Sequence, residues 1–199
     1  MRIAINPRHP EPRKIAQAVA VLQRGGVVAY PTDTVYGLGC DITNKRAVDT
    51  IYRAKRMEHS QLLSFVCADL AEVARYGVVD DATYRLLRRL VPGAYTFVLE
   101  ATREVPKVLR LKRKTVGVRV PDHPVAHALV QGLGNPVAST SASLDGEVFV
   151  DPEDIERHFP DVDLILEADD CGIVPSTIID FSSGTPVVIR EGAGPIDLL

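Results

Sequence analysis

The chain has 199 residues, of which 46% are hydrophobic and 25% charged, and its formal net charge is −3 at pH 7. This balance is that of an ordinary globular protein and excludes an intrinsically disordered chain. No apolar run approaches the ~20 residues that a membrane-spanning helix needs, and the N-terminus lacks the features of a secretory signal. Three widely separated cysteines fit reduced thiols rather than a disulfide framework. We therefore expect a soluble, cytoplasmic protein that does not bind membranes and forms one domain over residues 1–199.

Strand and helix signals alternate along the chain. In chain order, we expect a strand at residues 2–5, a helix at 10–24, a strand at 27–30, a helix at 45–56, a strand at 62–66, helices at 69–76 and 80–90, strands at 95–99 and 115–120, a helix at 124–133, a strand at 137–140, a helix at 152–158, and strands at 164–166, 177–181 and 187–190. Gly25 and Gly26 end the first helix, and Asn44 is a suitable N-cap for the second. This mixture predicts a single-domain α/β fold, with a twisted mixed parallel/antiparallel sheet flanked by helices.

Charge is distributed unevenly along this fold. Residues 45–119 are rich in Lys and Arg, whereas residues 145–170 are acidic. A basic middle in a nearly neutral chain indicates a local anionic partner rather than general binding to polyanions. For any single charge, a solvated position on the surface remains the simpler interpretation.

Residues 30–40 (YPTDTVYGLGC) carry the first candidate site. Three hydroxyls and the Asp33 carboxylate follow an expected strand, and we interpret the segment as a loop that binds a small ligand. The glycines, Gly37 and Gly39, either take a positive φ or let another group approach the backbone closely. A tight turn with threonine caps is the alternative for this segment, and Asp33 could position a ligand amine or cap the turn.

Three further segments carry polar groups suited to anionic oxygens. Lys55 and Arg56 stand at an expected helix end, where they complement the helix dipole or neutralise a phosphate. Four of the five residues at 139–143, after a short strand, carry hydroxyls, although such serine-rich turns often bind nothing. Ser176 and Arg190 lie at the edges of late strands. His123 and His127 have the spacing of a metal pair but lack an evident third ligand, so no protein metal site is expected.

Taken together, these segments resemble the YrdC-like family, which includes the threonylcarbamoyl-AMP synthases. The resemblance rests on residues 30–40, the pair at 55–56, residues 92–96, 118–121, 140–142 and 175–178, and Arg190 before Gly192. Residues 92–99, 112–115 and 139–141 look most like the YciO branch. The resemblance covers nearly the whole chain in the family's order.

The resemblance implies a large basic concave surface and an ATP-dependent enzyme. Such an enzyme converts threonine, bicarbonate and ATP, with Mg²⁺ accompanying the ATP, into threonylcarbamoyl-AMP and pyrophosphate, and its product serves the threonylcarbamoyladenosine modification of tRNA. The roles that carry over are catalysis for Lys55 and Arg56; substrate binding for Thr32, Tyr36 and Ser176; and nucleotide binding for Lys55, Ser139, Ser141, Ser143 and Arg190.

Three positions depart from the synthase pattern. Arg56 stands one position away from the usual arginine, Gln61 replaces a second lysine, and Ser143 replaces an asparagine. These changes predict a slower enzyme or a shifted substrate. The alternative is a protein that binds tRNA or double-stranded RNA without synthase activity. Its basic surface would comprise Arg85, Arg88, Arg89, Arg110, Lys112, Arg113 and Lys114.

Overall fold

The computed structural model describes residues 1–110, 114–168 and 171–197. Their strands are β1 (Arg2–Ala4), β2 (Val28–Tyr30), β3 (Gly37–Asp41), β4 (Ser64–Val66), β5 (Tyr95–Glu100), β6 (Thr115–Arg119), β7 (Val137–Ser141), β8 (Ser143–Leu144), β9 (Glu147–Val148), β10 (Leu164–Glu167), β11 (Thr177–Asp180) and β12 (Val187–Arg190). The helices are α1 (Pro12–Gln23), α2 (Lys45–Ala54), α3 (Leu70–Tyr76), α4 (Asp81–Leu90), α5 (Pro124–Leu133) and α6 (Pro152–His158).

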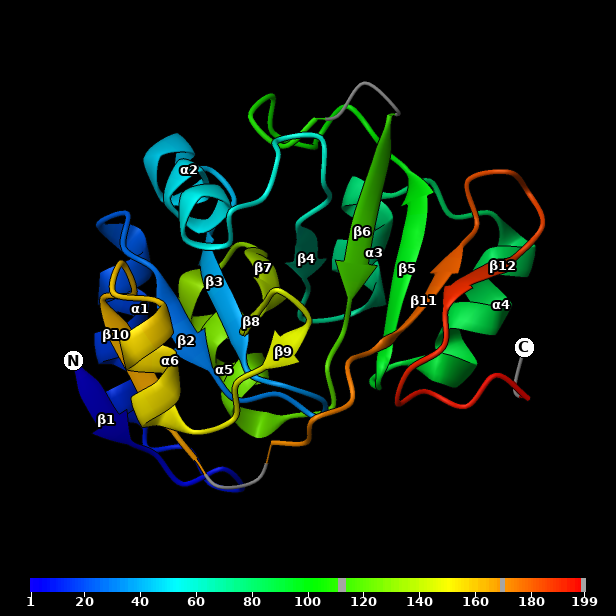
Figure 1. Ribbon diagram of the computed structural model, residues 1–199. Coiled ribbons are helices and arrows are strands. Elements are labelled where there is room, and N and C mark those ends of the chain that lie inside the picture. Colours follow the sequence, from blue (N-terminus) through cyan, green and yellow to red (C-terminus); the bar gives the residue numbers. More distant parts are fainter. Residues whose placement is uncertain (111–113, 169–170, 198–199) are drawn as a thin grey trace.

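Ten of these strands form one mixed sheet, as the sequence predicted (Figure 1). Its order is β1-β10-β2-β3-β7-β4-β6-β5-β11-β12, and β8 and β9 form a separate ribbon. β4 and β6 run parallel to each other, whereas β7 is antiparallel to β4 and β5 is antiparallel to β6. This order brings the ends of β2, β6 and β11, which are distant in the sequence, to the same part of the molecule.

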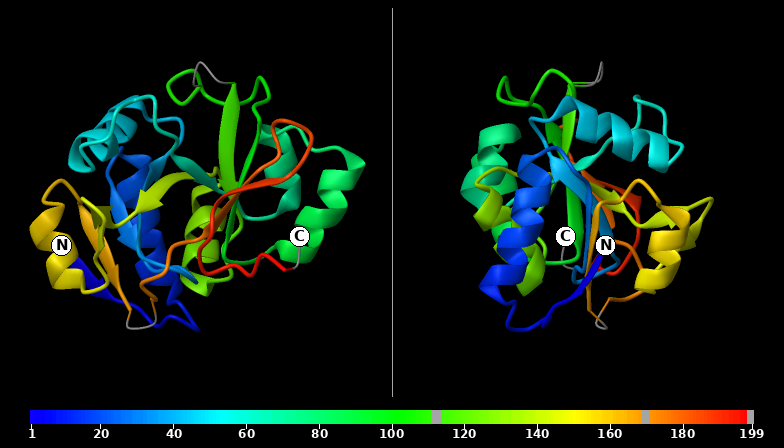
Figure 2. Two further views of the ribbon diagram at one scale, coloured as in Figure 1. Left: turned by 45° about the vertical axis from the view of Figure 1, so that its right-hand side comes forward. Right: turned by 90° about the vertical axis from the view of Figure 1, so that its left-hand side faces the viewer.

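Helices cover both faces of the sheet. α1 and α5 lie on one face and α2 and α6 on the other (Figure 2). One apolar cluster joins Leu22 of α1 and Leu129 of α5 to Val28 and Tyr30 of β2. The alternate residue of the same strand, Ala29, belongs to the larger cluster on the other side. β2 is therefore buried on both faces of the sheet, as its continuous apolar sequence indicates. None of the helices in the described ranges is long and apolar enough to cross a membrane.

Every expected element is present, with ends shifted by at most two residues. The interpretation of residues 37–40 as part of a loop was wrong, because they belong to β3, which pairs antiparallel with β2 and β7. The glycines of this strand have no positive φ. Instead, a Cβ on Gly37 would lie 2.9 Å from Cζ of Tyr30, and a Cβ on Gly39 would clash with Cγ1 of Val137. Close packing is therefore the reason for glycine at both positions.

Gly39→Ala is expected to destabilise the protein by about 1–3 kcal/mol, because the new methyl group has no space between the Val137 and Tyr30 side chains. Gly117→Ala in β6 is the matched control. Its Cβ would meet the rotatable Ser64 Oγ at 3.3 Å, so a smaller loss is expected. Urea unfolding of both variants measures the difference. If both variants lose the same free energy of unfolding, the requirement for glycine at position 39 comes from general backbone effects and not from its contacts with Val137 and Tyr30.

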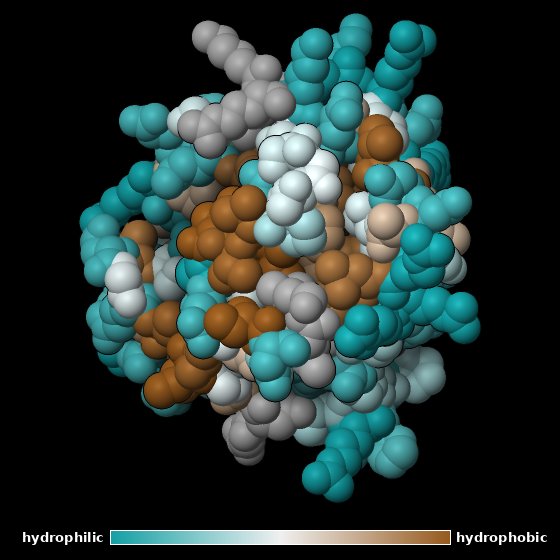
Figure 3. Space-filling view, turned by 90° about the vertical axis from the view of Figure 1, so that its right-hand side faces the viewer, coloured by the Kyte–Doolittle hydropathy of each residue, from teal (hydrophilic) through white to brown (hydrophobic). Residues whose placement is uncertain are grey.

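One edge of the sheet is open and apolar. β12 pairs with β11 on one side only, and its Val187, Val188 and Ile189 side chains are 53%, 38% and 57% exposed. Figure 3 shows apolar side chains gathered on the face that carries this edge. Natural edge strands are more often protected by charged residues or prolines. The strand therefore leaves both backbone groups and apolar surface accessible next to Arg190.

Candidate functional site

A cavity of about 160 Å³ lies where the ends of several strands meet. Its lining includes Arg119 at the end of β6 and Thr96 of β5. It also includes six of the residues for which sequence analysis predicted a binding role: Thr32, Tyr36, Ser139, Ser141, Ser176 and Arg190. The fold thus gathers side chains from positions 32 to 190 around a single small space.

The segment after β2 shapes the cavity with hydroxyls that already have partners. Thr32 Oγ1 donates to the Val35 carbonyl at 2.6 Å and accepts from the Thr34 amide at 3.1 Å, which fixes a tight turn. The Tyr36 hydroxyl donates to the Ala168 carbonyl and accepts from the Ala168 amide, both at 2.8 Å. Thr32 and Tyr36 are both buried. Their hydroxyls therefore stabilise the cavity wall.

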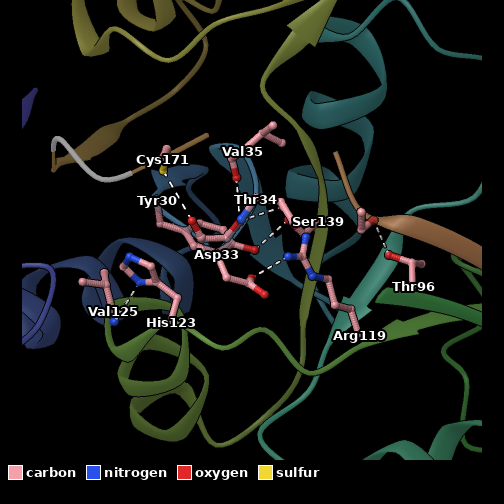
Figure 4. A network of polar contacts seen from close by, with 12 residues as sticks. Tyr30, Asp33, Thr34, Val35, Thr96, Arg119, His123, Val125, Ser139 and Cys171 are labelled. Atoms are coloured by element: carbon pink, nitrogen blue, oxygen red, sulfur yellow. Dashed lines mark hydrogen bonds and ion pairs between the residues drawn. The ribbon is translucent and has the colours of Figure 1, made fainter. Parts of the chain in front are cut away.

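Asp33 and Arg119 form a buried ion pair beside the cavity (Figure 4). Asp33 Oδ1 lies 2.5 Å from Arg119 Nη2, and the two side chains are 13% and 10% exposed. The Arg119 Nε atom is also buried and has no hydrogen-bond partner in the described chain. Asp33 thus holds a guanidinium, a role that sequence analysis did not consider.

Arg119 was missed as a site residue, although it lies within the 118–121 motif. The available signal was a charged residue inside an otherwise apolar strand that ends at Pro121. Buried charges in proteins are paired or bind ligands, so such a residue indicates a site or an ion pair. Its partner was not evident, because 86 residues separate it from Asp33.

A second guanidinium lines the same cavity. Arg190 donates through Nη2 and Nε to the Ser176 carbonyl, at 2.7 and 3.2 Å. The Ser176 hydroxyl in turn lies 2.8 Å from Thr96 Oγ1. Burial, and next the charge of Arg119, lower the pKa of Arg190 below its ordinary value. Two guanidiniums at one cavity favour an anionic ligand, which would offset their mutual repulsion.

The cavity lining also includes a phenol paired with a serine. Tyr30 donates to Ser139 Oγ at 2.6 Å. Burial raises the pKa of Tyr30 to about 12, although the Ser139 bond and the charge of Arg119 oppose the shift. Tyr30 therefore remains a neutral donor at physiological pH. The hydroxyl proton of Ser139 is left for a ligand or another neighbour.

Lys55 lies beside the cavity and contacts the hydroxyl segment. Its Nζ donates to the Ser141 carbonyl and to Ser143 Oγ, both at 2.9 Å, and to the Ser143 carbonyl. The hydroxyls of Ser141 and Ser143 are 2.8 Å apart. Burial lowers the pKa of Lys55 from 10.5 to about 8, so the ammonium form predominates at neutral pH. These three predicted residues therefore form one cluster, of which Ser141 also lines the cavity.

Arg56 is placed away from this cluster. It has a φ of 51°, and its side chain is 72% exposed and forms an ion pair with Asp145 at 3.4 Å. The reason is local: α2 ends at Ala54, and the left-handed turn that follows directs Lys55 and Arg56 differently. The structure therefore does not bring Arg56 to the cavity as a partner of Lys55.

The basic residues predicted to bind RNA fall into two groups. Arg85, Arg88 and Arg89 are exposed on α4, whereas Arg110 and Lys114 belong to the segment between β5 and β6. Lys112 and Arg113 lie outside the described residues. Arg110 donates to the carbonyls of Arg103 and Val105, which stabilises its own loop. Figures 1 and 2 show this loop at one end of the β5–β6 pair, apart from α4.

The described residues do not indicate a metal site or a reactive cysteine elsewhere. No group of three or more His, Cys, Asp or Glu side chains there could hold a metal ion. Burial raises the pKa of the Cys40 and Cys67 thiols, which disfavours the reactive thiolate. His123 Nδ1 accepts from the Val125 amide at 3.2 Å and caps α5. The polar cavity beside Lys55 is therefore the main candidate site.

A family model named Sua5_yciO_yrdC, with the description "Telomere recombination", matches residues 20–192. The chain belongs to this family. The YciO protein of Escherichia coli K12, whose own function is uncharacterized, is 44% identical over 196 residues, which are 96% of this chain and 95% of YciO. The threonylcarbamoyl-AMP synthase of Bacillus subtilis is 36% identical over 187 residues, which are 90% of this chain but 53% of the synthase.

Solved structures of the family have the same fold. The crystal structure of E. coli YciO matches with a TM-score of 0.95 and 42% identity, over 100% of this chain and 98% of that one. The structure of P. abyssi Sua5 in complex with L-threonine matches with a TM-score of 0.89 and 30% identity, over 98% of this chain and 59% of that one. The chain thus spans YciO almost completely and little more than half of Sua5.

Proposed function

We propose that the chain is an ATP-dependent synthase of the threonylcarbamoyl-AMP type. The observation that carries this proposal is the cavity itself, where Arg119, Arg190 and a set of hydroxyls surround a small space beside the Lys55 ammonium. Two relatives support it: the B. subtilis protein bears the synthase's name, and P. abyssi Sua5 forms a complex with L-threonine. The substrates would be threonine, bicarbonate and ATP with its Mg²⁺.

The reaction requires positioning and charge neutralisation more than covalent catalysis. The threonine amine first captures CO₂ as a carbamate. A carbamate oxygen then forms a bond to the α-phosphorus of ATP, and the bond to the leaving pyrophosphate breaks. Both reactants are anionic, so cations that offset their repulsion and fix their alignment lower the barrier.

The residues divide between the two substrates. Ser176 and Arg119 would hold the threonine carboxylate, and Thr32 shapes the wall beside them. Arg190, for which sequence analysis predicted nucleotide binding, donates to the Ser176 carbonyl and would therefore join this carboxylate site instead. The Lys55 ammonium, with the hydroxyls of Ser141 and Ser143, would lie along the phosphates at the open side. Ser139 would complete the nucleotide contacts. This arrangement assigns the small cavity to the amino acid and leaves the larger nucleotide to extend along the cluster of Lys55, Ser141 and Ser143.

The departures from the synthase pattern predict slow turnover. Arg56 points to solvent, and Ser143 already shares its hydroxyl with Lys55 and Ser141. Each missing polar contact costs about 1–3 kcal/mol if its partner is left unpaired. We therefore expect a rate about 10²–10⁴ below that of a synthase with the complete pattern.

Purified protein is expected to release pyrophosphate from ATP only when threonine, bicarbonate and Mg²⁺ are all present. Omitting each component in turn tests the requirement, and mass spectrometry should detect threonylcarbamoyl-AMP. Pyrophosphate release that does not depend on threonine and bicarbonate would indicate a contaminating enzyme or another reaction. Absence of release from protein shown to be folded would overturn the proposal.

Binding to tRNA or double-stranded RNA without chemistry is the competing function. It rests on the exposed arginines of α4, and it predicts an affinity that falls steeply with salt. If RNA binds in this way while no pyrophosphate is released, the RNA-binding function is favoured over the synthase. The proposed link to tRNA modification requires threonylcarbamoyl-AMP as the product, so it applies only if pyrophosphate is released.

A further inference from the structure

One side-chain hydrogen bond at the cavity joins two strands that are not neighbours in the sheet. Tyr30 ends β2 and Ser139 lies on β7, and β3 runs between these two strands. The Tyr30 hydroxyl nevertheless donates to Ser139 Oγ at 2.6 Å (Figure 4). Adjacent strands are about 4.8 Å apart, so the phenol side chain must reach across the whole width of the middle strand.

The two glycines of β3 make room for this side chain. Gly37 pairs with Tyr30 of β2, and Gly39 pairs with Ser139 of β7. A Cβ on Gly37 would lie 3.0 Å from both the Tyr30 hydroxyl oxygen and Ser139 Oγ. A Cβ on Gly39 would lie 2.8 Å from Cε1 of Tyr30. The Tyr30 ring therefore lies over a strip of bare backbone, and a side chain at either glycine would displace it from Ser139.

The direction of the hydrogen bond determines what Ser139 can do. Burial raises the pKa of Tyr30 to about 12, so the phenol keeps its proton and donates it to Ser139 Oγ. Ser139 accepts in this bond, and its own proton must point elsewhere. Among the described residues no acceptor takes that proton, although Ser139 is only 6% exposed. A buried donor without a protein acceptor indicates an acceptor atom on a ligand.

The surroundings of Ser139 favour an anionic oxygen as this acceptor. Ser139, Ser141 and Arg119 line the same cavity. Ser141 is two residues beyond Ser139 on β7, so both side chains project from the same face of the strand. Ser141 also belongs to the cluster with Lys55 and Ser143 that would lie along the phosphates. Ser139 therefore continues this row of polar groups toward the interior of the cavity.

We propose that Tyr30 is a positioning residue for the nucleotide, which holds Ser139 as a hydrogen-bond donor to an oxygen of ATP. Tyr30 acts through Ser139 and needs no contact of its own with the substrate. The inference rests on the proposed function, because it concerns the contact that Ser139 would make there. It assigns a role to a residue for which sequence analysis predicted none, and it relates the two glycines of β3 to ligand binding.

Tyr30→Phe tests the proposal, because it removes the hydroxyl and keeps the ring over the glycines. Isothermal titration calorimetry with ATP, Mg²⁺ and threonine, in buffer freed of CO₂, measures binding without turnover. The dissociation constant for ATP should rise about tenfold, whereas that for threonine should not change. Tyr95→Phe is the matched control. The Tyr95 hydroxyl also has a single partner, the Pro195 carbonyl at 2.9 Å, but Tyr95 does not line the cavity.

A double-mutant cycle tests whether Tyr30 acts through Ser139. Ser139→Ala should weaken ATP binding by about 10–100-fold, and the addition of Tyr30→Phe should cause no further loss. Losses that multiply, or equal losses in Tyr30→Phe and Tyr95→Phe, would overturn the inference.

The same titrations separate this inference from the proposed function. A change in the threonine constant instead of the ATP constant would overturn the assignment of Ser139 to the nucleotide. If ATP binding follows the expected pattern but the unmodified protein releases no pyrophosphate, the synthase function is wrong and the role of Tyr30 is supported. If the unmodified protein does not bind ATP, both are overturned.

Discussion

Lys55→Met is expected to lower kcat/KM for ATP in pyrophosphate release by about 10²–10³-fold. Methionine keeps most of the apolar stem but removes three donors, which contact the Ser141 carbonyl and both the carbonyl and Oγ of Ser143. The variant thus loses the cation that would contact the phosphates. It also loses the hydrogen bonds that hold Ser141 and Ser143 in place. Initial rates of threonine-dependent release measure the effect.

Lys45→Met is the matched control. Lys45 is exposed at the first position of the same helix, so the same substitution changes the net charge equally. Its activity should stay near that of the unmodified protein. If Lys45→Met loses as much activity as Lys55→Met, general electrostatics rather than the cluster of Lys55, Ser141 and Ser143 would explain the loss.

The pH dependence offers a second readout for Lys55. Because burial lowers its pKa to about 8, kcat/KM for ATP should decline above that pH as the ammonium loses its proton. Stability should change in the opposite direction. Between pH 8 and the ordinary value of 10.5, the unfolded chain binds more protons than the folded chain, so stability rises with pH. Both dependences should be absent from Lys55→Met.

Elements that depend on local signals were predictable from the sequence. Asn44 accepts from the Ala47 amide at 3.1 Å and begins α2, as its capping character indicated. β3 was missed because glycine is a poor strand former, and its presence reflects contacts with Tyr30 and Val137 that only the folded sheet creates. The β8–β9 ribbon was also missed, although Asp145-Gly146 is a known turn signal and both residues have a positive φ.

The candidate site shows the same division between local and long-range information. The resemblance to the family identified the segments that converge, and six predicted residues line one cavity. The roles of the individual side chains required the fold. The Tyr36 hydroxyl binds the Ala168 backbone, and a left-handed turn directs Arg56 to solvent. These outcomes depend on pairing between distant segments and on a single backbone angle, which residue types do not specify.

Asp33→Asn is expected to reduce the free energy of unfolding by about 3–5 kcal/mol. The substitution removes the charge that compensates Arg119, whose side chain is only 10% exposed and whose Nε atom has no hydrogen-bond partner in the described chain. A buried guanidinium without a compensating charge destabilises the folded state. The loss of unfolding free energy should therefore exceed the net contribution of the Asp33–Arg119 pair to stability. Urea unfolding without ligands measures it, and Thr43→Ala, at an exposed position after β3, serves as a control for minor polar changes.

A double-mutant cycle with Arg119→Met separates the pair from its surroundings. Once the guanidinium is absent, the amide that replaces the Asp33 carboxylate no longer faces an unpaired charge, so the double variant should be more stable than the sum of the two single losses predicts. Threonine binding should be lost in Arg119→Met and in the double variant. In Asp33→Asn the guanidinium is present without its carboxylate, so an anionic ligand should restore part of the lost stability. Additive losses, or equal responses of all variants to threonine, would mean that Asp33 and Arg119 act independently and that Asp33 does not hold the guanidinium for an anion.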